Sequence, residues 1–287
     1  MPSSIRQPHV LVIQDLSLVG RCSSMAALPV LSCAGIHCAL LPTALFSTHT
    51  GFPSPWRYPL TREMGEILEK WSALPVHFDG IYVGYLASDD QFVVVDAVLD
   101  RFLAPDTRLF VDPVMGDHGR RYSGCTAALT SGFQRLSKRA DVIFPNPTEA
   151  ALLLDQPPGT ADNSLETTAL QLPALVQLGA KAAVVTGVED GTRIGAGILE
   201  AGQNAPAYAL HRRYPGSYPG TGDLFASCVV AGVLRGKCLE TACATAAEFM
   251  QRAMSFAGKT GTEVRFGVPF EFALPWLAQQ YDEGYTP

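Results

Sequence analysis

The segment RLFVDPVMGDHGRRYSGCTAALTSGFQRLSKRADVIFPN, residues 108–146, holds a complete strand–helix–strand unit. Its two ends, RLFVDPV (108–114) and ADVIFPN (140–146), are short and apolar, which is typical of strands buried on both faces of a sheet. Residues 125–138 between them carry the pattern of a helix. Strands joined through a helix in this way are expected to lie parallel.

The same alternation continues on both sides of this unit. Further strands are predicted at 9–15, 36–46, 80–86 and 182–187, with Pro42 expected to interrupt the second of them. Further helices are predicted at 22–34, 61–74 and 89–103, and from Pro147 onward. The pattern predicts an α/β fold with a mostly parallel central sheet covered by helices on both faces.

The pattern changes after residue 190. GTRIGAGILE (191–200) and APAYALHRRY (205–214) predict a hairpin joined by a polar turn, and LFASCVVAGVLRG (224–236) predicts an apolar helix. The chain carries no internal repeat, low-complexity tract or linker. Residues 1–287 are therefore predicted to form a single domain.

Composition excludes several classes of protein. Lys and Arg number 21 against 27 Asp and Glu, so the net charge of −6 speaks against a nucleic-acid partner and against attraction to an anionic membrane. The 47% hydrophobic content excludes global disorder. Seven cysteines without C-x-x-C, and a start that does not resemble a signal peptide, predict reduced thiols in a cytoplasmic protein. Six scattered histidines give no zinc-site spacing.

The sequence Gly220-Thr221-Gly222-Asp223 opens the apolar helix and follows a loop of Pro, Gly and Ser. Backbone N–H groups at a helix N-terminus attract anions, and glycines let a phosphate approach the backbone closely. A carboxylate in the same turn could accept a proton from a hydroxyl group. The alternative is an ordinary helix cap with an acidic residue in its first turn.

Two acidic motifs leave the ends of predicted strands. Asp112-Pro113-Val114-Met115-Gly116-Asp117 carries two carboxylates suited to a divalent cation, or else forms a simple turn. Phe144-Pro145-Asn146-Pro147-Thr148-Glu149 has the order of a helix start, with Asn as cap and Glu in the first turn. In open α/β sheets, ligands bind beyond such strand ends.

FSTHTGF (46–52) and Gly84-Tyr85 follow two other predicted strands, where the tyrosine could stack on a flat ligand or close the edge of the core. The chain has no G-x-x-x-x-G-K-[ST] and no G-x-G-x-x-G after its first strand. A P-loop and a dinucleotide-binding fingerprint are therefore absent.

Taken together, these motifs resemble the pyridoxal/pyridoxamine kinases of the ribokinase-like superfamily. The resemblance runs from Val10 to about Trp276 and rests on IQDLSLVGRCSSMAALPVLSCAGI, FSTHTGF, GYLAS, DPVMGDHGRRY, FPNPTEAALLL, VVTG and GTGDLFA. DPVMGD and GTGD are shared with hydroxymethylpyrimidine kinases, whereas FSTHTGF and GRCS favour the vitamin B6 branch. The resemblance implies a three-layer α/β/α sandwich.

The implied activity is the ATP-dependent phosphorylation of the 5′-hydroxymethyl group of pyridoxal, pyridoxamine or pyridoxine. Mg²⁺, often with K⁺, and a homodimer are implied as well. By this resemblance, Asp223 is the catalytic base, and Gly220, Thr221 and Gly222 surround the γ-phosphate. The remaining implied roles are Asp112 and Glu149 with Asn146 for Mg²⁺ and phosphate, Thr186 for the nucleotide, Asp117, His118 and Tyr122 for a flap, and Asp15, Phe46, His49, Thr50 and Tyr85 for the pyridine ring.

Two positions depart from the family pattern. The best-known relatives carry Ser at the position of Asp15, which leaves the preferred vitamer open. Relatives often carry Thr at the position of Phe144, which leaves monovalent-ion binding open. Two other functions remain: a hydroxymethylpyrimidine kinase of thiamine synthesis, and a catalytically silent binding protein on the same scaffold.

Overall fold

The computed structural model describes residues 6–160 and 162–282. The strands of the main sheet are β1 (His9–Ser17), β2 (His37–Phe46), β3 (Arg57–Pro59), β4 (Gly80–Val83), β5 (Arg108–Val111), β8 (Val142–Ile143), β9 (Ala182–Asp190), β10 (Arg193–Glu200) and β11 (Ala207–Arg212). Their order is β11-β10-β9-β8-β5-β4-β1-β2-β3. All pairs from β9 to β2 are parallel, and β10, β11 and β3 at the two edges pair antiparallel.

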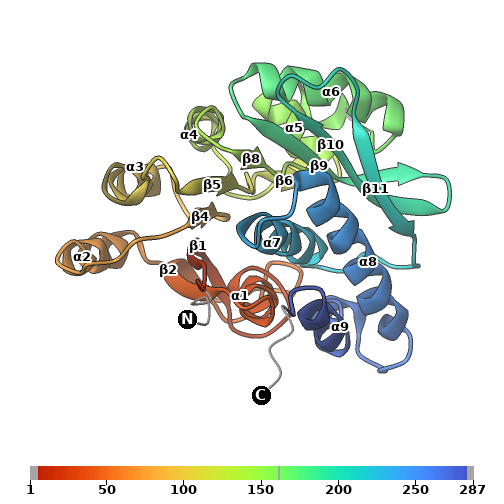
Figure 1. Cartoon of the computed structure of the whole chain (residues 1–287), viewed down its shortest axis with the longest axis horizontal. Helices are drawn as coiled ribbons and strands as arrows, with labels where there is room; N and C mark the ends of the chain where they lie inside the picture. The colour runs from red at the N-terminus through yellow and green to blue at the C-terminus, as the bar shows by residue number, and fades with distance from the viewer. Residues whose placement is uncertain (1–5, 161, 283–287) are drawn as a thin grey trace, which may run out of the picture.

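Helices cover both faces of this sheet (Figure 1). One face carries α1 (Ser24–Cys33), α7 (Thr221–Leu234), α8 (Leu239–Ala257) and α9 (Leu274–Gln279). The other carries α2 (Thr61–Trp71), α3 (Gln91–Phe102), α4 (Ala127–Ser137), α5 (Pro147–Leu153) and α6 (Leu165–Gln177). The fold is thus a three-layer α/β/α sandwich, which confirms the prediction from the sequence.

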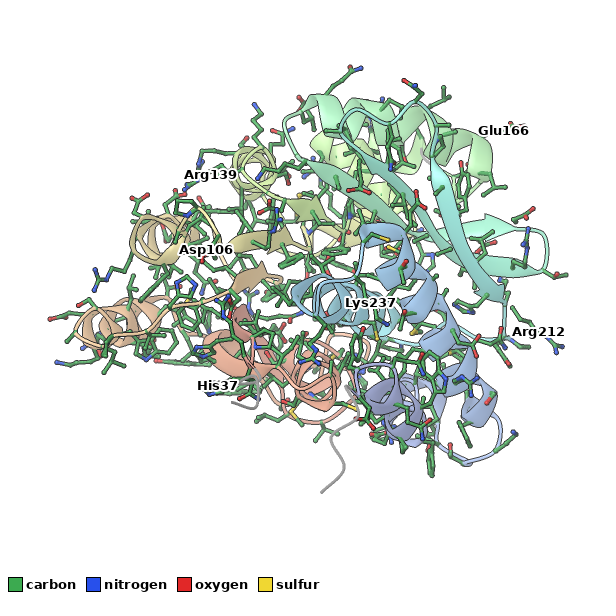
Figure 2. The ribbon with its side chains drawn as sticks, in the orientation of Figure 1. His37, Asp106, Arg139, Glu166, Arg212 and Lys237 are labelled. Carbon is green, nitrogen blue, oxygen red and sulfur yellow. The ribbon has the colours of Figure 1, made fainter. Side chains whose placement is uncertain are left out.

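Alternating side chains of β1 show how two cores form. Val10 and Val12 pack into the core beneath α1, α7 and α8, whereas Leu11 and Ile13 pack into the core beneath α2 to α5. All four are fully buried because a central parallel strand faces helices on both sides. Figure 2 shows side chains filling the layers on both sides of the ribbon, with Arg139, Glu166 and Arg212 at the margin of the view.

The strands near the carboxyl edge are shorter than the sequence predicts. The strand predicted at 80–86 ends at Val83, that at 108–114 ends at Val111, and that at 140–146 covers only Val142–Ile143. Leu86, Met115 and Phe144 beyond these ends are buried although they lie outside the strands. The residues that leave the sheet are the ones that carry the polar motifs, so they lie in loops at its carboxyl edge.

Other elements differ from the prediction as well. β2 continues through Pro42, which lies opposite Gln14 where the β1–β2 register shifts, so the missing N–H falls at an existing irregularity. Helices α6 and α8, strand β3 and the small hairpin of β6 (Gly116–Asp117) and β7 (Arg120–Arg121) were not expected from the sequence. The predicted hairpin after residue 190 is confirmed as β10 and β11. None of the described helices has the length and apolarity needed to cross a bilayer.

Candidate active site

Asp223 lies in the first turn of α7 and is held by two hydrogen bonds. Gln14 Nε2 donates to Asp223 Oδ1 at 2.7 Å, and the backbone N–H of Ser23 donates to Asp223 Oδ2 at 2.8 Å. Burial, with a smaller contribution from the charge of Asp15, raises the pKa of Asp223 to about 6 against the opposing effect of these two donors. A carboxyl group with that pKa is mostly ionised at neutral pH, and its pKa is near enough to neutral pH for it to accept a proton during the reaction.

The backbone around Asp223 leaves N–H groups free at the helix start. The first hydrogen bond of α7 runs from Leu224 N to Gly220 O at 3.0 Å, so the amides of Thr221, Gly222 and Asp223 precede the hydrogen-bond ladder. Gly222 is exposed, so this turn reaches solvent. An anion can therefore approach these amides from outside.

Gly220 is required by its surroundings. Its φ of 81° is left-handed, and a Cβ there would lie 1.9 Å from the carbonyl oxygen of Arg21. The loop after β1 therefore packs directly against the start of α7. This close approach brings Ser23 to Asp223.

A second group of carboxylates lies at the ends of β5 and β8. Asn146 and Glu149 form a capping box at the start of α5, with Asn146 Oδ1 accepting from Glu149 N at 3.0 Å and Glu149 Oε2 accepting from Asn146 N at 2.9 Å. Met115 N donates to the remaining oxygen of Glu149 at 3.0 Å, and Asn146 Nδ2 donates to Gly116 O at 2.8 Å. The predicted cap is confirmed, and both side chains also hold the loop after Asp112.

Asp112 and Glu149 are both buried and electrostatically coupled. Burial raises the pKa of each carboxyl group well above its usual range, and Asp112 raises that of Glu149 further. Asp223 acts on Asp112 in the same direction. Tyr82, fully buried on β4, donates its hydroxyl to Asp112 Oδ2 at 3.5 Å. The site thus gathers three carboxylates from β5, α5 and α7.

The hairpin β6–β7 lies beside these carboxylates. His118 and Gly119 form its turn with φ of 49° and 73°, and Gly119 N donates to Thr148 Oγ1 at 2.9 Å. Burial, followed by the charges of Glu149 and Asp117, raises the pKa of Tyr122. The side chain of Tyr122 is nevertheless 43% exposed, so it borders the site rather than filling it.

The residues predicted to hold a pyridine ring lie at the ends of β1, β2 and β4. Asp15 is buried and accepts from Ser17 Oγ at 3.0 Å. The rings of Phe46 and Tyr85 meet edge to face at 5.7 Å between centroids. They belong to a small cluster, with Ala44 and Ala87, that is separate from the two cores.

His49 and Thr50 are placed differently from these aromatics. Both ring nitrogens of His49 contact the backbone: Nε2 lies 2.7 Å from Arg265 O, and Nδ1 accepts from Gly51 N at 3.0 Å. The ring therefore fixes the 49–51 turn against residue 265 and has no nitrogen left for a ligand. Thr50 is exposed.

Thr186 is half-buried on β9, and its backbone N–H donates to Pro145 O at 3.0 Å. It therefore lies next to the loop that carries Asn146. The structure places Gln14, Ser23 and Cys22 at the site as well, none of which the sequence analysis selected. Gln14 could have been identified from the sequence, because it is a polar residue within the apolar run HVLVIQD. Ser23 could not, because it contacts Asp223 through its backbone N–H, which every residue except proline has.

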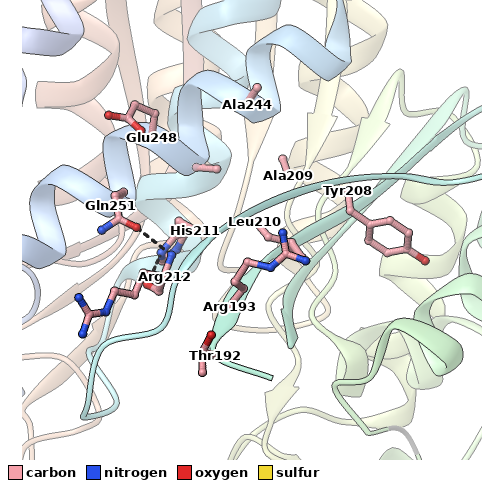
Figure 3. Close-up of a pocket in the computed structure, with 11 residues that line it drawn as sticks. Thr192, Arg193, Tyr208, Ala209, Leu210, His211, Arg212, Ala244, Glu248 and Gln251 are labelled. Atoms are coloured by element: carbon pink, nitrogen blue, oxygen red, sulfur yellow. Dashed lines mark hydrogen bonds between the residues drawn. The ribbon is translucent and has the colours of Figure 1, made fainter. Parts of the chain in front are cut away.

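Two cavities lie near the loops of the C-terminal third. One of about 640 Å³ is lined by Gly51, Ser217, Pro219 and residues 263–265, between the 46–52 segment and the loop that precedes Gly220. The other, of about 460 Å³, lies between β11 and α8 (Figure 3), and none of the predicted site residues lines it. The first cavity is the one that adjoins the candidate site.

Comparisons with known proteins identify the family of the chain. Residues 66–266, more than half of the chain, match the family model described as phosphomethylpyrimidine kinase. The chain belongs to this kinase family. A pyridoxal kinase of Leifsonia xyli is 31% identical over 246 residues, which cover 81% of this chain and 83% of that protein.

Solved structures of the family share the fold of this kinase chain closely. A protein of Bacteroides thetaiotaomicron assigned to the phosphomethylpyrimidine kinases, crystallised with pyridoxal, superposes with a TM-score of 0.87 at 32% identity and covers 95% of this chain and 96% of its own. The pyridoxal kinase of Lactobacillus plantarum gives the same TM-score and identity over 98% of this chain and 100% of its own. These relatives place the chain among the ribokinase-like kinases.

Proposed function

We propose that this protein transfers the γ-phosphoryl group of ATP to the 5′-hydroxymethyl group of a vitamin B6 vitamer, giving the 5′-phosphate. The observation that carries the proposal is Asp223, a carboxylate with a pKa of about 6 beside the free amides of a helix N-terminus. Relatives at about 30% identity that are pyridoxal kinases, and one crystallised with pyridoxal, support this acceptor.

Asp223 acts as the base in this reaction. As the acceptor oxygen attacks the γ-phosphorus, its proton passes to the Asp223 carboxylate and the bond from the γ-phosphorus to the bridging oxygen of ADP breaks. Gln14 and Ser23 hold the two carboxylate oxygens in place. The amides of Thr221, Gly222 and Asp223 hydrogen-bond the negative charge on the phosphoryl group, which is strongest where water is excluded.

Asp112 and Glu149 fit a magnesium ion. Burial raises both pKa values, and the charges of Asp223 and Asp112 raise those of Asp112 and Glu149 respectively, so a nearby cation would favour both ionised forms. No cluster of three His, Cys, Asp or Glu able to hold a metal occurs within residues 6–160 and 162–282. Mg²⁺ suits such a sparse site because it takes one or two carboxylates and completes its shell with phosphate oxygens and water. When bound, it supplies neutralisation of phosphate charge.

The other implied features belong to the same proposal. Asn146 and Thr186 contact the nucleotide phosphates, and Asp117, His118 and Tyr122 close over the acceptor and exclude water. Phe46, His49, Thr50 and Tyr85 surround the ring, with His49 acting through the turn it fixes. We propose K⁺ as a second cation, and a cytoplasmic homodimer as the working form, on the family resemblance alone.

A panel of acceptors tests the function. Purified protein with Mg-ATP should phosphorylate pyridoxal, pyridoxine or pyridoxamine faster than 4-amino-5-hydroxymethyl-2-methylpyrimidine, measured as ADP release. Asp223→Ala should lose at least about a thousandfold in kcat and keep its affinity for ATP, since base catalysis and charge placement act together. The matched control is Asp100→Ala, an exposed position on α3.

Three results would contradict the proposal in different ways. A clear preference for the pyrimidine would support the second candidate, which the family description favours. Vitamer binding without ADP release would indicate a silent binding protein. Near-normal turnover by Asp223→Ala would remove Asp223 as the base.

A further inference from the structure

Tyr82 places a hydroxyl group in a mostly apolar layer of the fold. It lies on β4, opposite Val12 of β1 and Phe110 of β5, and is fully buried in the core beneath α1, α7 and α8. A phenylalanine would fill this position without burying a polar group, which is costly unless the group is hydrogen-bonded. The structure supplies a partner for the hydroxyl, because Tyr82 donates to Asp112 Oδ2 at 3.5 Å.

The three carboxylates of the site are held to different degrees. Asp223 and Glu149 each accept two hydrogen bonds. In the part of the chain that the structure describes, the carboxylate of Asp112 accepts only the one from Tyr82. Its backbone is fixed, because Asp112 N donates to Val83 O at 2.8 Å. The orientation of the Asp112 carboxylate therefore depends on a single hydroxyl group.

The two carboxylate oxygens of Asp112 differ in their surroundings. Oδ2 accepts from Tyr82, whereas Oδ1 accepts no hydrogen bond from the described residues. Asp112 is 8% exposed, and Oδ1 is not one of the buried polar atoms that lack a partner, so it is the oxygen that reaches solvent. The hydroxyl of Tyr82 thus engages the buried side of the carboxylate and leaves its open side to a ligand.

Two further groups act on the Tyr82 hydroxyl. Burial, followed by the charges of Asp112 and Asp223, raises the pKa of Tyr82 well above its usual range, and Ser227 acts in the opposite direction. Ser227 lies one turn after Asp223 on α7, and its buried Oγ has no hydrogen-bond partner within the described residues. A phenol keeps its proton at neutral pH, so the Tyr82 hydroxyl is available as a donor to the carboxylate.

We propose that Tyr82 is a positioning residue of the magnesium site: its hydroxyl holds Oδ2 of Asp112 on the buried side and so keeps Oδ1 available to the cation. The inference rests on the proposed function and deepens it, because Tyr82 acts through Asp112 and is itself buried away from the ligands. Residues that hydrogen-bond a metal ligand from behind fix its orientation, and their loss weakens metal binding.

The test compares Tyr82→Phe, which keeps the ring and removes the hydroxyl, with Tyr281→Phe. Tyr281 is the matched control because its hydroxyl is also buried, has no hydrogen-bond partner and lies in the segment after α9. The Mg²⁺ concentration that gives half of the full effect is measured in two ways. One is vitamer phosphorylation at saturating ATP and vitamer; the other is the rise of the unfolding temperature with Mg²⁺ in the presence of ADP, which needs no turnover.

The two measurements should agree. In Tyr82→Phe, the half-saturating Mg²⁺ concentration should rise about tenfold, at the lower end of such effects because the hydrogen bond is long. The kcat at saturating Mg²⁺ and the KM for the vitamer should change by less than about twofold, since Tyr82 contacts neither reactant. Tyr281→Phe should behave like the wild type.

Asp112→Asn separates positioning from a change in core packing. Glu149 and the nucleotide phosphates remain to bind Mg²⁺ in this variant, so its Mg²⁺ requirement can still be measured. If Tyr82 acts through Asp112, adding Tyr82→Phe to Asp112→Asn should change that requirement by less than about twofold. An equal effect of Tyr82→Phe in both backgrounds would show that packing is responsible, and would overturn the inference.

The remaining outcomes distinguish the inference from the proposed function. A Tyr82→Phe variant with the wild-type Mg²⁺ requirement would overturn the inference and leave the proposed function intact. A Tyr82→Phe variant that is unfolded without ligand would make the hydroxyl a structural group and overturn it as well. A wild type whose unfolding temperature does not respond to Mg²⁺ would overturn the inference together with the magnesium site, and a wild type that phosphorylates no vitamer would overturn the proposed function itself.

Discussion

At the scale of single residues, the site depends on carboxyl groups held in unfavourable surroundings. Asp223 combines burial, which raises its pKa to about 6, with two donors that oppose the rise. With weaker donors, the pKa of Asp223 would rise and the group would be protonated at neutral pH. With full solvation, its pKa would fall and Asp223 would be a poorer base. The hydrogen bonds from Gln14 and Ser23 therefore set the pH range in which Asp223 accepts a proton.

The pH profile follows from this pKa. Asp223 must be ionised to accept the proton, so kcat/KM for a vitamer should be constant above about pH 7 and fall about tenfold per pH unit well below pH 6. Gln14→Leu removes a donor to the ionised form and should shift the inflection to higher pH. Steady-state rates across pH 5 to 9 in a constant-ionic-strength buffer give the inflection points of the wild type and of Gln14→Leu. An unchanged inflection in Gln14→Leu would contradict the assignment of this inflection to Asp223.

Asp112 gives a prediction about stability. Burial raises its folded-state pKa well above the unfolded value, so the folded state binds this proton more tightly. Stability is therefore lost as pH rises through the window between these two pKa values. Asp112→Asn should remove that loss: its free energy of unfolding in metal-free buffer should exceed that of the wild type at pH 7, by a margin that shrinks toward pH 4. Urea unfolding at several pH values measures the margin, and a constant difference would exclude this cause.

At the scale of elements, helix starts and strand ends do most of the positioning. The start of α7 presents three amides, and its approach to the loop after β1 depends on a glycine. The start of α5 is a capping box whose two side chains also fix the loop after β5. Asn146, Glu149 and the amides of α7 are thus positioned by the helix starts to which they belong.

Gly220→Ala tests the start of α7. Its left-handed φ and the 1.9 Å approach to Arg21 O leave no room for a Cβ, so the variant should lose more than about 1 kcal/mol of stability and most of its activity. Gly222→Ala is the matched stability control, because a Cβ there meets nothing within 4 Å. The measurements are thermal unfolding and the rate of vitamer phosphorylation. Equal stability of the two variants would show that the loop carrying Arg21 moves to make room for the Cβ, and would contradict this prediction.

Much of this element scale could be predicted from the sequence. The apolar runs and the order Asn146-Pro147-Thr148-Glu149 indicated the strands and the cap because local chemistry decides both. The early ends of β5 and β8 could not be predicted, since buried loop residues such as Phe144 are as apolar as strand residues. Gln14, Ser23 and Tyr82 were missed because their roles depend on contacts across 200 residues or on burial under the site.

At the scale of the whole molecule, the site joins segments from the beginning, middle and end of the chain. The parallel sheet brings the loops after β1, β2, β4, β5 and β8 to one edge, and α7 adds Asp223 from the last third. The order of strands, rather than any single motif, explains why residues distant in sequence meet there.

Ligand binding should therefore stabilise the entire fold. Mg-ATP at about 100 times its Kd should add about 2.7 kcal/mol to the free energy of unfolding. Removing Mg²⁺ with EDTA at the same ATP concentration should abolish most of this gain. Differential scanning calorimetry provides the measurement, with Asp112→Asn as the variant expected to respond least to Mg²⁺. Full stabilisation by ATP in EDTA would contradict the assignment of Asp112 and Glu149 to a metal.

The loop at residues 20–23 has one more consequence. Arg21 N donates to Phe266 O at 3.2 Å, Arg21 Nε pairs with Glu271 at 2.7 Å, and Gly220 packs on its carbonyl. The loop that holds Asp223 therefore depends on residues more than 240 positions further along the chain for its own position. A chain cut before residue 260 would lack both contacts, so Ser23 and Asp223 would lose part of the support that holds them together.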